Sequence, residues 1–362
     1  MASCAAALPS AGPHTPSLPS SPAGSSAGSS ASFPDELCEW LLATPPPPAH
    51  AAPPHIPADV GPPPFAPLPS DLAVGESGWL PAAAASLRHN GFCILRHPPR
   101  APPRVDPQLC AACARAASRQ LLHLLAAARG VGLAPRRELF RFAEICSRAA
   151  GGLRYDMRLP LRLEGAAAEP VLARACAEAS GAEGEAWDAL HAAVDGVARG
   201  VVLASGLLAV EGRGEEGVCA LDSAGCVTSL PGAPDQHFHP DGTAEGLVNA
   251  FVALVPTTVL NGPTELRPGS HVWVESALGP EPRWDERTST TVAELAVGEI
   301  LLFDYRTYHR GRANRSDEPR PVAYLVYARP GVSDQHNFPA ESLLTALANG
   351  ADYSVVDSTA TD

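Results

Sequence analysis

The sequence predicts a mostly β protein with flanking helices, preceded by a segment that stays disordered. From Leu207 onward, short runs of β-forming residues alternate with Gly, Asn and Pro, a texture typical of a β-sandwich or barrel. Between residues 107 and 205, Leu and Ala recur with a period near 3.6, which predicts helices. The first 70 residues hold 18 of the 39 prolines, so the chain divides into regions of different character.

Residues 1–70 form a Pro/Ala/Ser-rich segment with only four charged residues. Such a composition cannot bury enough apolar surface to offset the entropy of ordering, so we expect disorder. The stretch Asp35–Leu42 alone has the pattern of a short amphipathic helix. An ordered domain is predicted over 71–340, followed by a C-terminal tail at 341–362.

The first half of that domain is predicted to be mainly helical. Gly91–Leu95 reads as a strand, and Leu153–Pro160 as a second one that interrupts the helical pattern. Helices are predicted over 107–129, 136–149 and 183–204. The helical part therefore spans 107–205.

The second half, 206–330, is predicted to be a β-core of about eight strands. Short β-forming runs bounded by turn residues define them. The expected strands are 207–211, 217–221, 225–229, 247–255, 271–274, 290–296, 299–305 and 321–328.

Charge and hydropathy exclude several classes of partner. The chain has 26 basic residues, all Arg, against 39 acidic ones, for a net charge of −13. Nucleic-acid binding and docking on anionic membranes are therefore not expected. No run of 18 apolar residues predicts a membrane span. No secretory signal is visible, so we expect an intracellular and preferably cytoplasmic protein whose nine cysteines are mostly reduced. The sequence does not define its oligomeric state.

The segment Gln236–Gly242 carries the sharpest chemical signal. In an extended chain, residues i and i+2 share a face, so His239 and Asp241 can converge on one metal ion. His309, which follows a predicted strand, is the best candidate for a third ligand. Two His and one carboxylate leave three coordination positions open, as in non-haem Fe(II) oxygenases.

Arg320 extends this pattern. It lies 11 residues after His309, and a turn signal separates the two at Asn314–Asp317. A hairpin about that turn would place Arg320 on the neighbouring strand, across from or diagonal to His309. A buried guanidinium there could hold a dicarboxylate in bidentate fashion. An ordinary surface Arg is the alternative.

Three blocks in this region resemble the phytanoyl-CoA dioxygenase family of Fe(II)/2-oxoglutarate oxygenases. They are Gln-His-Phe-His-Pro-Asp-Gly at 236–242, Asn-Gly-Pro-Thr-Glu-Leu-Arg-Pro-Gly-Ser-His at 261–271, and the run 298–314 that contains His309. The resemblance implies a double-stranded β-helix (jelly-roll/cupin-like) core. It also implies a dioxygenase that uses Fe(II), 2-oxoglutarate and O2, with ascorbate as a reductant in vitro.

By the same resemblance, His239, Asp241 and His309 bind iron. Arg320 binds the distal carboxylate of 2-oxoglutarate, with Gln236 and Thr264 as further contacts. The implied reaction hydroxylates a small organic substrate and releases succinate and CO2. The C-terminal tripeptide is not a peroxisomal signal, so a direct counterpart of the peroxisomal fatty-acyl enzyme is not expected.

Alternatives remain open. His237-x-His239 could belong to a cupin-type metal set that does not use 2-oxoglutarate, although Glu245 comes one residue late for that pattern. The core could also be inactive and bind only a metal or ligand, with the Pro-rich segment recruiting partners. His271 reads as structural. Asp304 could orient a ligand His or pair with a nearby Arg. Arg154, Tyr155 and Arg158 could line a polar substrate entrance or belong to an ordinary strand with exposed Arg.

Overall fold

The computed structural model describes residues 67–98, 102–148, 153–159, 182–209, 219–272, 289–334 and 338–353, all within the unit Ala31–Asp362. The predicted helix at Asp35–Leu42 and all but the last four residues of the predicted disordered segment lie outside these ranges. The described chain is a mixed α/β structure built on a large antiparallel sheet. A β-sheet core with flanking helices is confirmed, but the described fold is mixed α/β rather than mostly β.

The large sheet contains eight strands in the order β1-β2-β9-β6-β11-β5-β4-β3. All neighbouring pairs are antiparallel except β1 and β2. The bounds are Asp71–Ala73 (β1), Phe92–Arg96 (β2), Ile145–Ser147 (β3), Arg154–Arg158 (β4), Ala220–Ser229 (β5), Leu247–Ala253 (β6), Ile300–Asp304 (β9) and Arg320–Ala328 (β11).

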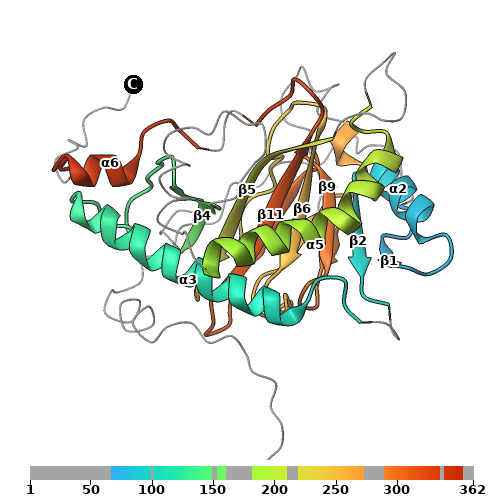
Figure 1. Ribbon diagram of the computed structural model, residues 1–362, viewed down its shortest axis with the longest axis horizontal. Helices are drawn as coiled ribbons and strands as arrows, with labels where there is room; N and C mark the ends of the chain where they lie inside the picture. The colour runs from blue at the N-terminus through green and yellow to red at the C-terminus, as the bar shows by residue number, and fades with distance from the viewer. Residues whose placement is uncertain are drawn as a thin grey trace, which may run out of the picture. The chain divides into compact units, whose positions relative to one another are not determined.

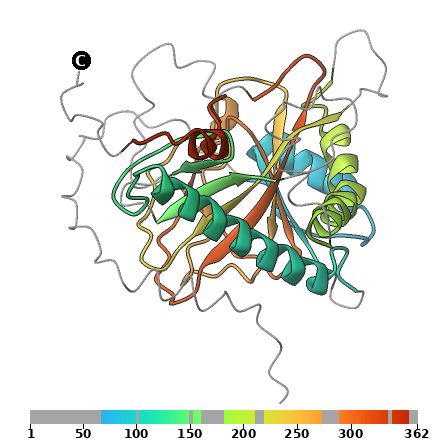
Figure 2. The same cartoon turned by 60° about the vertical axis from the view of Figure 1, so that its left-hand side comes forward.

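Helices cover one face of this sheet. They are α2 (Trp79–Asn90), α3 (Pro107–Gly130) and α5 (Ala182–Ser205), and Figures 1 and 2 show α3 and α5 along the same side. Asp106 begins α3 by accepting a hydrogen bond from Gln108 N at 2.8 Å, with Pro107 in the first turn. A short helix, α6 (Leu343–Ala348), packs near α3.

A smaller sheet covers part of the other face. It consists of β10 (His309–Gly311), β7 (Thr264–Leu266) and β8 (Thr291–Ala293), in that order. Apolar side chains of both sheets form one buried cluster between them: Phe92, Ile94, Ala253, Leu266, Ala293, Leu295, Leu301 and Phe303. The space between the sheets is called the interior below.

Strand alternation determines which residues face the interior. In β6, Val248, Ala250 and Val252 belong to the core beneath the helices. Their neighbours Asn249, Phe251 and Ala253 therefore point to the opposite side, into the interior. The same alternation directs Arg154 of β4 and Arg320 of β11 into the interior, because Tyr155 and Ala323 pack toward the helices.

The predicted helix at 136–149 is wrong. This segment forms turns followed by β3, which pairs with β4 through Ile145 and Met157. Phe140, Phe142 and Ile145 all pack into the core. Pairing at the sheet edge therefore overrides the local helical pattern.

Two predicted strands also differ. Residues 207–208 form a turn, and 210–218 lie outside the described residues. Residues 270–272 form a 3-10 turn, η1, rather than the start of a strand at 271. The predicted strands 217–221 and 225–229 belong to a single strand, β5, over its described part.

None of the helices in the described ranges is both long and apolar enough to cross a membrane.

Candidate metal centre

The segment 236–241 runs antiparallel beside β10. His239 N donates to His309 O at 3.0 Å, and His309 N donates to His239 O at 2.9 Å. Gln236 N donates to Gly311 O, and Asp241 N to Tyr305 O, both at 3.0 Å. These bonds form an isolated bridge rather than a regular strand, yet they hold His239 and Asp241 beside His309.

Three candidate ligands converge at this bridge. One ligand atom from each of His239, Asp241 and His309 lies within 4.8 Å of the others. His309 Nε2 is 3.7 Å from Asp241 Oδ1. The His309 side chain is buried, whereas His239 and Asp241 are partly exposed. The arrangement is one imidazole from a sheet strand and two ligands from the adjacent extended segment.

Hydrogen bonds at Nδ1 leave the Nε2 atom of both imidazoles available to bind a metal. Nδ1 of His239 lies 2.9 Å from His237 O, and Nδ1 of His309 lies 2.9 Å from Thr307 O. A carbonyl oxygen can only accept, so Nδ1 carries the proton and Nε2 keeps its lone pair. Burial, together with the neighbouring His309 ring, lowers the pKa of His239 to about 4. His239 is therefore neutral near pH 7, as a metal ligand must be.

Arg320 lies on the same side of the sheet but not in a hairpin with His309. The predicted pairing is wrong: β10 pairs with β7 in the small sheet, and β11 pairs with β5 and β6 in the large one. The chain crosses between the sheets after Gly311. Arg320 is 3 % exposed, and Nε donates to Asn261 O at 3.4 Å. Burial lowers the pKa of Arg320 to about 10.

A second buried guanidinium lies beside Arg320. Arg154 and Arg320 are both register partners of Ser229, one on each side of β5. Within the part of the chain that the structure describes, no carboxylate is in ion-pair distance of either guanidinium. Burial and the charge of Arg320 lower the pKa of Arg154 to about 9. Two unpaired buried cations side by side are unfavourable unless an anion joins them.

Arg154 also connects the segments around the site. Its Nη atoms donate to Arg312 O at 2.9 Å and to Gly311 O and Pro234 O at 3.3 Å. A Cβ at Gly311 would lie 3.0 Å from the Arg154 guanidinium and 2.8 Å from Gln236 Oε1. Glycine at 311 therefore permits this close approach. The sequence left Arg154 as either an entrance residue or an exposed strand residue; it is fully buried at 1 %.

Gln236 and Thr264 lie next to this arrangement. Gln236 Oε1 accepts from Gly311 N at 3.0 Å, and its Nε2 donates to Arg148 O at 3.3 Å. Thr264 is buried and pairs in register with Gly311, so its side chain shares the inward face of the small sheet.

The cupin-type set does not form. Among the described residues, the ligand group contains His239, Asp241 and His309 only. His237 is exposed, and Glu245 forms an ion pair with Arg306 at 2.9 Å.

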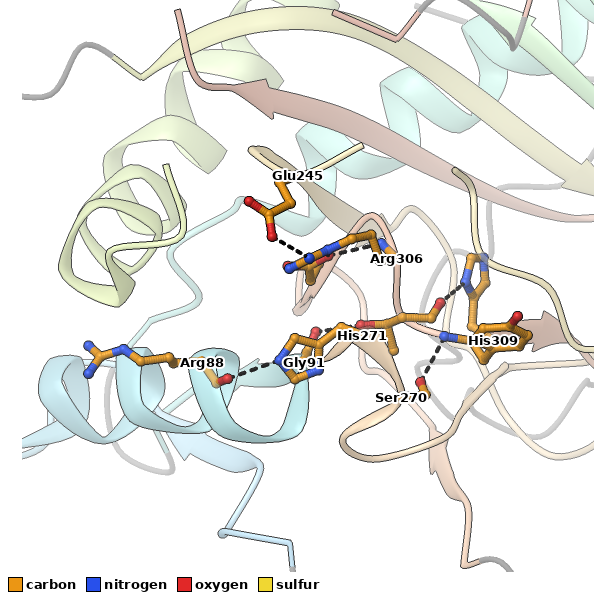
Figure 3. A network of polar contacts seen from close by, with 10 residues as sticks. Arg88, Gly91, Glu245, Ser270, His271, Arg306 and His309 are labelled. Atoms are coloured by element: carbon orange, nitrogen blue, oxygen red, sulfur yellow. Dashed lines mark hydrogen bonds and ion pairs between the residues drawn. The ribbon is translucent and has the colours of Figure 1, made fainter. Parts of the chain in front are cut away.

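His271 and Asp304 have structural partners. His271 is 2 % exposed, and its Nε2 lies 3.0 Å from Arg88 O, as Figure 3 shows. Helix α2 ends at Gly91, which has a positive φ of 81°. A Cβ at Gly91 would lie 2.5 Å from Nδ1 of His271, so the ring packs directly against this glycine. Asp304 binds Arg306 through two bonds of 3.0 Å. This agrees with the second of the two roles considered for Asp304. Neither residue belongs to the ligand group.

Besides the candidate ligands and the two buried arginines, a third cluster of polar side chains lies on the interior face. This cluster was not predicted from the sequence. Tyr324 OH donates to Asp156 Oδ1 at 3.0 Å, and Arg148 donates to Asp156 Oδ2 at 2.8 and 3.0 Å. Arg148 and Arg158 lie over the ring of Phe338, at 5.6 and 5.0 Å from its centroid. The alternation of Arg154, Asp156 and Arg158 along β4 was the available sequence signal.

Comparison with known proteins agrees with this geometry. Residues 223–322 match the model of the phytanoyl-CoA dioxygenase (PhyH) family. The chain is 32% identical over 109 residues to dioxygenase hkm4 of Aspergillus hancockii, covering 27% of this chain and 34% of that protein. It is 33% identical over 104 residues to ectoine dioxygenase of Halomonas elongata, covering 23% and 31%. The matches thus span about a third of each relative.

Among solved structures, AviO1 from Streptomyces viridochromogenes Tue57 aligns with a TM-score of 0.42 and 17% identity, over 70% of this chain and 97% of that one. The family match falls on the same segment of the chain that contains His239, Asp241 and His309. Over residues 223–322 the chain is thus similar to the phytanoyl-CoA dioxygenase family, and the curated relatives it matches are named as dioxygenases.

Proposed function

We propose that this protein is an Fe(II)- and 2-oxoglutarate-dependent dioxygenase that hydroxylates a small organic substrate. The observation that carries the proposal is the convergence of His239, Asp241 and His309, with both Nε2 atoms free to bind metal. We infer that the two sheets correspond to the double-stranded β-helix of this class. The relatives include ectoine dioxygenase of Halomonas elongata, which supports a small-molecule substrate.

The residues present suit this chemistry. Three protein ligands leave positions for a 2-oxo acid and O2, and the bound iron and cosubstrate supply the oxidising power. Arg320 provides a buried guanidinium for the distal carboxylate. Arg154 adds a second positive charge from β4, on the other side of β5 from Arg320. Gln236 and Thr264 border this position. Phe251 and Val227 face the interior and are only partly buried, so solvent reaches the interior face of the sheet at these residues.

Asp241 favours hydroxylation over halogen transfer. An anionic carboxylate occupies a coordination position and lowers the positive charge of the site, and both effects disfavour a bound halide. We expect products that gain one oxygen atom, even in high chloride.

The test is release of succinate from 2-oxoglutarate with added Fe(II) and ascorbate. The proposed dioxygenase forms succinate, and a screen of cell extract by mass spectrometry detects a product heavier by one oxygen atom. An inactive binding protein binds Fe(II) but forms no succinate. A metal enzyme that leaves 2-oxoglutarate unconsumed in the presence of its substrate would contradict the proposal.

The catalytic unit is proposed to be 71–340. Asn90 exchanges two hydrogen bonds of 2.9 Å with the main chain of Leu68, so a shortened protein should keep residues from Pro67 onward. We expect this shortened protein to retain its thermal unfolding transition and its 2-oxoglutarate turnover, measured beside the full chain. A folded shortened protein without turnover would place part of the catalytic unit before residue 67.

A further inference from the structure

Asn249 is a buried amide on the interior face of β6. It is 2 % exposed, and its register partners are Val326 in β11 and Phe303 in β9. A polar group between apolar neighbours costs about 1–3 kcal/mol when it lacks a partner. A specific partner must therefore account for asparagine at this position.

That partner is the carboxylate of Asp241. Asn249 Nδ2 donates to Asp241 Oδ2 at 2.6 Å, a charge-assisted hydrogen bond. The other oxygen, Oδ1, lies 3.7 Å from His309 Nε2. The two oxygens of Asp241 thus have different surroundings: Asn249 holds Oδ2, and Oδ1 is directed to the ligand group.

We infer that Asn249 is a positioning residue that keeps Asp241 a one-oxygen ligand. The inference rests on the proposed function, because it assigns the metal to His239, Asp241 and His309. A carboxylate can bind a metal through one oxygen or two. If both oxygens bound, one of the three positions left for the 2-oxo acid and O2 would be lost. A fixed donor on Oδ2 prevents this and sets the direction of Oδ1.

Two substitutions separate positioning from packing. Asn249→Leu keeps the approximate volume but removes the donor and excludes water. Asn249→Ala removes three heavy atoms and leaves space near the ~30 Å³ that one water molecule occupies, and that water can donate to Oδ2. If Asn249 positions Asp241, Asn249→Leu should weaken metal binding more than Asn249→Ala does. If Asn249 only fills space, Asn249→Ala should be the less stable of the two variants, because it leaves a cavity.

The experiment measures Co(II) binding to the full-length metal-free protein by absorption titration, beside its thermal unfolding. Loss of an orienting partner costs about 10–100-fold in metal affinity, and we expect such a fall, with an altered Co(II) absorption spectrum, in Asn249→Leu. Asn249→Ala should lose less. The affinity of the Co(II)-loaded protein for 2-oxoglutarate should follow the same order. Thr228→Val is the matched control, because Thr228 is similarly buried, at 1 %, but lies on β5, which β11 separates from β6, and faces the helices.

Each outcome has a separate meaning. If wild-type protein fails to bind Co(II) at His239, Asp241 and His309, the proposed function fails. If wild-type protein binds Co(II) and Asn249→Leu binds it equally well with an unchanged spectrum, the role of Asn249 is overturned while the function stands. A loss of affinity in Asn249→Ala that exceeds that in Asn249→Leu would show a packing role instead.

Discussion

Arg320→Ala should weaken 2-oxoglutarate binding by about 30- to 4,000-fold. Removing one partner of a buried charge pair costs roughly 2–5 kcal/mol, since the remaining carboxylate is left without a counter-ion. Fe(II) affinity should change little, because Arg320 is not among the candidate ligands. Arg320→Lys should recover only part of the loss, since an ammonium lacks the planar fork of a guanidinium. The measurement is 2-oxoglutarate titration of the metal-loaded variants.

Stability provides the control for this prediction. Burial lowers the pKa of Arg320 to about 10, so the folded state disfavours the charged form. A group of this kind destabilises the ligand-free fold at pH 7, below both the folded and the unfolded pKa, and this penalty fades as pH rises through about 10. Arg320→Met should therefore unfold at the same temperature as wild type or higher. An unchanged cosubstrate affinity in Arg320→Ala, or a strongly destabilised Arg320→Met, would identify a structural arginine.

The sequence predicted the long strands and the helices α3 and α5 because their patterns extend over many residues. Strands β7 and β10 have three residues each, too few for a periodic pattern. They exist because β10 also bridges to His239 and because β7 lies between two partners. Such pairings depend on tertiary contacts that local sequence does not encode.

The candidate ligands were predictable for a different reason. The spacing of His239 and Asp241 suits any extended backbone, so their convergence did not require a regular strand. The route from His309 to Arg320 was not predictable in the same way, because a turn signal does not specify which sheet receives the next strand. The burial of Arg154 beside Arg320 was also not predictable from local patterns, because the residues to which it donates hydrogen bonds lie 75 to 158 positions away in the sequence.

Asp241→Gly should abolish 2-oxoglutarate turnover and weaken metal binding. The substitution removes one of three candidate ligands, and we expect a loss well above the roughly 10–100-fold caused by disturbing an orienting partner. His309→Ala should have the same effect, since its Nε2 lies 3.7 Å from Asp241 Oδ1. The measurement is iron stoichiometry and succinate release for both variants beside wild type.

His271→Ala is the matched control for these two variants. His271 is as buried as His309 and lies in the same polar network (Figure 3), but it bonds to Arg88 O rather than to the ligand group. Its loss should cost about 1–3 kcal/mol of stability, because a buried side chain is removed and the Arg88 carbonyl loses its partner. Iron stoichiometry should stay unchanged. Full iron and full turnover in Asp241→Gly, or loss of iron in His271→Ala with a folded chain, would show that the metal binds elsewhere. Iron loss confined to Asp241→Gly and His309→Ala is the result that the converging ligand atoms predict.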